Sequence, residues 1–164
     1  MGPLAPITEN PLVIRIWLVR VGLAALAVVN AWWGAWAYVA PRNFFDTFPG
    51  FGHHWTAAYP PYNEHLITDL GSTFLTLAAL LAAAAVLSDR RVRTVVLGGA
   101  LVFNTLHLAF HLGHHQGMAP FDAAASLTSL ALGVLAPVVL LVLNARLTPR
   151  VTPRRTRSTP DRPS

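Results

Sequence analysis

The chain alternates between four long apolar stretches and shorter polar segments. The apolar stretches cover about 12–40, 66–87, 94–112 and 121–144. A helix of about 20 residues crosses the hydrocarbon of a bilayer, so each stretch is long enough to span it once. We therefore predict an all-α integral membrane protein, an antiparallel four-helix bundle over 12–145. A flexible leader at 1–11 and a disordered basic tail at 146–164 flank this domain.

The composition supports a membrane protein and excludes several chemistries. Hydrophobic residues make up 54% of the chain, charged residues 12%, and the mean hydropathy is +0.48, far above that of a soluble domain. The chain has no cysteine, which excludes thiolate metal sites, iron–sulfur clusters and thiol redox chemistry. It has no phosphate-binding loop, nucleophile elbow or nucleotide fingerprint, so ATP-driven and serine-hydrolase chemistry find no support.

The arginines predict the orientation in the membrane. All 12 basic residues are arginine, and half of them follow Ala145. Arg15, Arg20, an arginine-rich turn at 90–93 and the tail would all lie on one side, which the positive-inside rule makes cytoplasmic. Both termini are then cytoplasmic, in a multi-pass protein of the bacterial cytoplasmic (inner) membrane. The net charge of +5 belongs mainly to the tail, so we expect the lipid bilayer as a partner and no nucleic acid.

The longest loop, from 41 to 64, carries an unusual number of aromatic residues. It contains four phenylalanines (Phe44, Phe45, Phe48 and Phe51) together with one tryptophan and two tyrosines. Exposing so many aromatic side chains to water is unfavourable. We therefore predict that this loop is an extracytoplasmic cap that lies in the membrane–water interface or folds over the mouth of the bundle. Asn63 is placed to cap the helix that follows.

The third apolar stretch ends in a column of histidines. On a helix of 100° per residue, His107, His111 and His114 fall within about 60° of one another. Asn104 and His115 flank them on the same side of this helix. Placing an ionisable group inside a membrane span costs free energy, and such groups usually have a functional role. This column of histidines is therefore the first candidate for a functional site.

A second polar pair begins the preceding span. His65 and Asp69 lie four residues apart, and an antiparallel hairpin would bring them to the membrane depth of His107 and His111. Two ligands from each of two facing helices are a common way to hold zinc, iron or copper. The sequence therefore predicts a divalent transition-metal site of His65, Asp69, His107 and His111. Second-layer or mouth residues would be Glu64, Asn104, His114 and His115.

Other interpretations of the same residues stay open. A haem between His65 and His107 or His111 is one alternative. A metal-free enzyme is another, with His65, Asp69 and His107 as candidates for acid–base catalysis on a lipid, sterol or quinone-like substrate. In a third interpretation the polar cluster has only a structural role. The chain would then be an accessory subunit, or form a homo-oligomer, and would associate through small residues such as Gly98-Gly99-Ala100. The pattern does not decide whether the protein is an enzyme.

Two resemblances rest on these motifs. The run Phe45-x-x-Phe48-Pro49-Gly50, then Tyr62-Asn63-Glu64-His65-x-x-x-Asp69-x-Gly71 and His107-x-x-x-His111, resembles small four-span membrane proteins of high-GC bacteria. This resemblance covers 41–115 and implies the fold but no activity. His107/His111 and His111/His114/His115 are more weakly similar to the histidine boxes of membrane fatty-acid desaturases and hydroxylases. Those enzymes need more boxes, usually on the cytoplasmic side. A general similarity to small sterol isomerases and sterol-binding proteins has no motif behind it.

Overall fold

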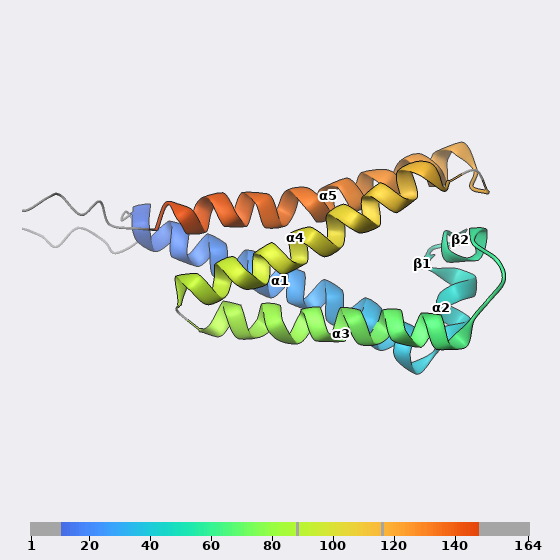
Figure 1. Cartoon of the computed structure of the whole chain (residues 1–164), viewed down its shortest axis with the longest axis horizontal. Coiled ribbons are helices and arrows are strands. Elements are labelled where there is room, and N and C mark those ends of the chain that lie inside the picture. Colours follow the sequence, from blue (N-terminus) through green and yellow to red (C-terminus); the bar gives the residue numbers. More distant parts are fainter. Residues whose placement is uncertain (1–10, 88, 116, 148–164) are drawn as a thin grey trace, which may run out of the picture.

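Four long helices form the body of the molecule. The computed structural model describes residues 11–87, 89–115 and 117–147. The long helices are α1 (Pro11–Val39), α3 (Glu64–Val86), α4 (Arg90–Gly113) and α5 (Pro120–Ala145). All four are long and apolar enough to cross a membrane, and they run up and down the bundle side by side (Figure 1). The prediction of an all-helical structure with four long apolar helices is confirmed, with helix ends shifted by a few residues.

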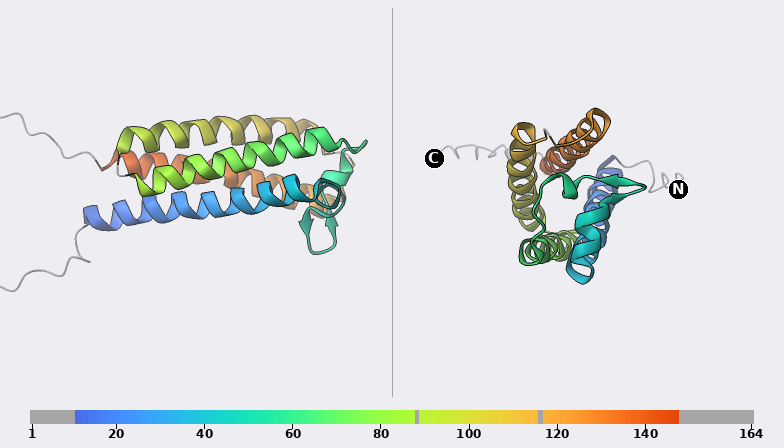
Figure 2. Two further views of the ribbon diagram at one scale, coloured as in Figure 1. Left: turned by 90° about the horizontal axis from the view of Figure 1, so that it is seen from below. Right: turned by 90° about the vertical axis from the view of Figure 1, so that its right-hand side faces the viewer.

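The loop between α1 and α3 is structured and lies across one end of the bundle (Figure 2). It contains α2 (Pro41–Thr47), the two-residue strands β1 (Pro49–Gly50) and β2 (His53–His54), and the short helix η2 (Thr56–Ala58). Gly50 and Gly52 take φ values of 96° and 84° in the tight turn between the strands, a region that favours glycine. Phe44 and Phe45 are buried under this cap, whereas Phe51 at the tip of the turn is 101% exposed.

Side-chain caps set the starts of α3 and α4. The side chain of Asn63 accepts a hydrogen bond from the backbone N–H of Leu66 at 3.1 Å, as the sequence predicted. Asp89 accepts from the N–H groups of Arg91 and Val92 at 2.6 and 3.1 Å, so α4 begins four residues before the apolar stretch does. These two hydrogen bonds stabilise the charged carboxylate and lower the pKa of Asp89.

The closest helix contact joins α1 to α3. A Cβ added at Gly34 would lie 2.8 Å from the backbone nitrogen of Leu75, and one added at Gly71 would lie 2.7 Å from that of Tyr38. Only glycine allows the two backbones this close. The glycine pair at 98–99, expected to serve close helix contact, has no described atom within 4 Å of an added Cβ. The expected association with a partner subunit stays a prediction.

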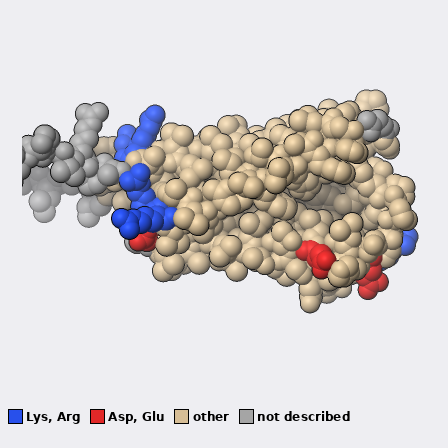
Figure 3. Space-filling view, in the orientation of Figure 1, with Lys and Arg blue, Asp and Glu red and all other residues tan. Residues whose placement is uncertain are grey.

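The four helices converge at the end that holds the start of α1 and α4 (Figure 1). Basic side chains gather there (Figure 3), and those of α1 and α4 are Arg15, Arg20, Arg90, Arg91 and Arg93, so it is called the arginine end. Val19, Leu23, Leu81 and Leu97 form a fully buried core there. Arg20 and Arg93 donate from Nε to the carbonyls of Ala85 and Ala84, at 3.0 and 3.3 Å, and so satisfy the C-terminal end of α3. Toward the opposite end α4 and α5 diverge from α1 and α3 (Figure 1).

We predict that Gly34→Ala and Gly71→Ala each destabilise the bundle by about 1–3 kcal/mol, because the added methyl group meets backbone atoms that cannot move aside. The measurement is the thermal unfolding midpoint in mild detergent. Gly98→Ala is the matched control, since its methyl group enters open space and alanine favours a helix. Equal midpoints for Gly71→Ala and Gly98→Ala would contradict the proposed backbone contact.

Candidate functional site

The divergence of the two helix pairs leaves a cavity of about 870 Å³ near the end opposite the arginines. Residues of α1, α3, α4, α5 and the cap line it, and most of them are apolar or aromatic. Trp33, Phe48, Trp55 and Phe74 belong to this lining. Figure 3 shows the hollow on the face between α3 and α4.

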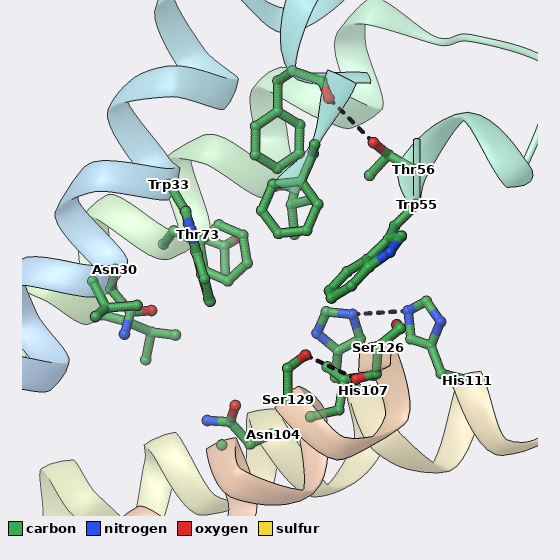
Figure 4. A pocket seen from close by; sticks show the side chains of 18 of the residues that line it. Asn30, Trp33, Trp55, Thr56, Thr73, Asn104, His107, His111, Ser126 and Ser129 are labelled. Atoms are coloured by element: carbon green, nitrogen blue, oxygen red, sulfur yellow. Dashed lines mark hydrogen bonds between the residues drawn. The ribbon is translucent and has the colours of Figure 1, made fainter. Parts of the chain in front are cut away.

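A small set of polar side chains lies on the otherwise apolar wall (Figure 4). From α1 and α3 these are Asn30, Asp69 and Thr73; from the cap and the residue before α3, Thr56, Tyr59 and Asn63; from α4 and α5, Asn104, His107, His111, Ser126 and Ser129. Three of the four predicted metal-site residues line the cavity: Asp69 from α3, and His107 and His111, which share the wall formed by α4. The helical period places them there, because residues four apart on α4 lie on one face.

The two histidines and Tyr59 form a chain of hydrogen bonds. His107 Nε2 and His111 Nε2 are 3.0 Å apart, and His111 Nδ1 lies 2.9 Å from the Tyr59 hydroxyl. The same hydroxyl donates to the backbone carbonyl of His114. Partial burial raises the pKa of Tyr59, so the phenol stays protonated well into alkaline solution. The chain thus leads from the cavity wall to the loop after α4.

His65 and Asp69 pair with each other and do not join this chain. His65 Nε2 lies 3.3 Å from Asp69 Oδ2, with the two side chains 87% and 62% exposed. Asp69 reaches the cavity wall, but His65 does not line it. In the part of the chain that the structure describes, no three His, Asp or Glu side chains come together in a group able to hold a metal ion. The four-residue metal site stays a prediction.

The flanking residues named from sequence have separate positions. Asn104 lines the cavity and donates from Nδ2 to the Ala100 carbonyl at 2.8 Å. His114 and His115 each bond through Nδ1 to a backbone carbonyl of the last turn of α4, at 2.8 and 3.2 Å. Glu64 is exposed in the first turn of α3. Of these four, only Asn104 lines the cavity.

Sequence reasoning missed the residues that tie the cap to α5. Asp122 Oδ1 accepts from Trp55 Nε1 at 3.0 Å and lies 2.6 Å from His53 Nδ1. This link holds the cap over the cavity mouth, and Tyr59 enters the histidine chain from the same cap. The sequence places His53, Trp55 and Asp122 in segments expected on the same side of the membrane. It contains no motif or spacing that predicts contacts between them.

A scan against protein-family models, a search of curated proteins and a search of solved structures found no match to this chain. The resemblances based on the loop and histidine motifs therefore stay predictions. The cavity and its polar wall are the features of the structure that point to a function.

We predict that Asp122→Ala loosens the cap, because His53 and Trp55 lose their shared acceptor. Hydrogen exchange of backbone amides at 42–59 should become at least about fivefold faster. Asp46→Ala is the control, because the partly exposed Asp46 carboxylate pairs with Arg42 of the same helix at 2.7 Å. Exchange that is unchanged in Asp122→Ala would show that the cap is held by its aromatic contacts alone.

Proposed function

We propose that this protein binds an apolar membrane molecule, such as a lipid, sterol or quinone-like compound, in the cavity between its helix pairs. The observation that carries this proposal is a cavity of about 870 Å³, lined mainly by apolar side chains and hollowed into a surface that would face lipid in a bilayer. Ligand pockets typically enclose about 300–1,000 Å³, with a few polar groups on an apolar wall. The volume and the lining support a ligand of lipid or cofactor size.

The histidine pair would meet the polar end of such a molecule. His107 stands in the cavity, and His111 links it to Tyr59 at 3.0 and 2.9 Å. A neutral imidazole can accept a proton from a bound group and return one, so the wall carries what acid–base chemistry requires. His65 and Asp69, the other acid–base candidates from sequence, are mostly exposed and belong to the rim.

The orientation follows from charge. The arginine end gathers the described arginines of α1 and α4 (Figure 3), and the positive-inside rule places this end in the cytoplasm. The cap and the cavity mouth would then face the extracytoplasmic side of a bacterial cytoplasmic membrane. A ligand could enter from the outer leaflet through the face between α3 and α4.

One observation favours a second candidate, a metal centre. The Nε2 atoms of His107 and His111 lie 3.0 Å apart on one wall, an arrangement that a single zinc, iron or copper ion could use. Tyr59 would then orient His111 through Nδ1, as outer hydrogen bonds commonly do for histidine ligands. Further ligands would come from Asp69 and His65 only if α3 moved toward α4, or from a bound molecule.

Filling the cavity should remove the ligand. Ser129 lies on the cavity wall (Figure 4), and we predict that Ser129→Phe lowers the amount of co-purifying lipid or quinone at least about tenfold. The measurement is mass spectrometry of extracts from protein purified in mild detergent. Thr128→Phe, one residue away and outside the lining, is the matched control. A wild-type extract no richer than that of Ser129→Phe would contradict binding in the cavity.

The metal candidate predicts about one ion per chain in protein purified without a histidine tag or chelator, because both Nε2 atoms bind it. Elemental analysis should find that ion lost in the His107→Ala, His111→Ala double variant and retained in His54→Ala, whose ring lies in the cap. A visible absorption spectrum would reveal haem. Folded wild-type protein that takes up no added zinc, iron or copper would rule this candidate out.

A further inference from the structure

The hydrogen-bond chain determines which nitrogens of the two histidines carry a proton. Tyr59 has one hydroxyl proton, and the carbonyl of His114 can only accept it. His111 Nδ1 must therefore be the donor to the Tyr59 oxygen. A neutral imidazole has one N–H, so His111 Nε2 is an acceptor and His107 Nε2 donates to it. His107 Nδ1 is left with a lone pair.

This lone pair faces the cavity. Figure 4 shows the ring of His107 standing in the cavity with one nitrogen toward His111 and the other on the opposite side, toward open space. Within residues 11–87, 89–115 and 117–147 no group donates a hydrogen bond to His107 Nδ1. A molecule that enters the cavity can therefore donate a hydrogen bond to this nitrogen.

Most hydroxyl groups around the cavity, like His107 Nδ1, are left as hydrogen-bond acceptors. Thr56, Thr73 and Ser129 donate to the backbone carbonyls of Phe45, Asp69 and Ser126, at 2.7, 2.9 and 2.8 Å, and Tyr59 donates to that of His114. Each hydroxyl has one proton, so its oxygen can then only accept from a ligand. Ser126 is the exception among the lining hydroxyls, with no acceptor in the described chain.

We propose that the ligand carries a hydroxyl group, and that His107 Nδ1 accepts its hydrogen bond while the apolar body lies among Trp33, Phe74 and Leu77. This inference rests on the proposed function and names its ligand class, an amphiphilic alcohol. A ligand whose polar end has only a carbonyl or ether oxygen would place a lone pair against that of His107. Such an unmatched contact in an apolar cavity is unfavourable.

The test compares all-trans-retinol with its methyl ether, which keeps the oxygen and loses the donor. Binding to the purified full chain is followed by energy transfer to the polyene from Trp33 and Trp55, which line the cavity. Retinol should bind about five- to tenfold more tightly than the ether. A straight-chain pair, hexadecanol and hexadecyl methyl ether, tested as competitors, should show the same preference on a different skeleton.

Two variants test whether the preference for the alcohol comes from its hydrogen bond to His107 or from the larger size of the methyl ether. His107→Phe removes the acceptor, and Tyr59→Phe removes the hydroxyl that keeps the proton on His111 Nδ1, so His107 is no longer held in one tautomer. Each should reduce the preference for the alcohol to about twofold or less. His54→Phe changes a cap histidine outside the cavity and should keep the full preference.

The outcomes distinguish this inference from the proposed function. If alcohol and ether bind the wild type equally, and Ser129→Phe weakens both, the cavity binds apolar molecules but the hydroxyl inference is wrong. A preference that survives in both His107→Phe and Tyr59→Phe also overturns it. If neither skeleton binds the wild type better than Ser129→Phe, binding in the cavity fails, and the inference fails with it.

Discussion

The close backbone contact between α1 and α3 is the constraint on which the rest of the structure depends. At Gly34 and Gly71 the two helices approach to a distance that excludes a Cβ atom. This contact commits α3 to α1, and α4 packs mainly against α5. The two pairs are joined at the arginine end, where Arg93 of α4 donates a hydrogen bond to the Ala84 carbonyl in the last turn of α3. Toward the opposite end the pairs separate and leave the cavity, and the cap bridges them there.

The polar groups in the cavity illustrate how a membrane protein keeps ionisable side chains in an apolar setting. His107 and His111 bind each other, and His111 is anchored by Tyr59 from the cap. The hydroxyls of Thr56, Thr73 and Ser129 satisfy backbone carbonyls. Such mutual satisfaction lowers the free-energy penalty of burial. It also gives the wall a defined pattern of donors and acceptors, which a flexible polar surface would lack.

The cap connects the cavity wall to the end of the bundle opposite the arginine end. Phe44 and Phe45 of the cap are buried against Trp36 and Tyr62, respectively. Asp122 of α5 holds Trp55 and His53 of the cap. The cap therefore bridges the two helix pairs at the end where they diverge. Because Tyr59 belongs to the cap and also binds His111, the position of the cap and the proton arrangement of the histidine chain are coupled.

The sequence by itself determined the four long apolar helices and the Asn63 cap, because apolar length and the side chain that precedes a helix are local properties. It did not determine which helices pair. The expected convergence of His65 and Asp69 with His107 and His111 assumed that α3 faces α4 closely, whereas α3 packs most closely against α1. Only the tertiary structure decided this, since Gly34 and Gly71 are far apart in sequence and their complementary shapes act only when the backbones meet. The cavity, Tyr59 and Asp122 follow from that pairing.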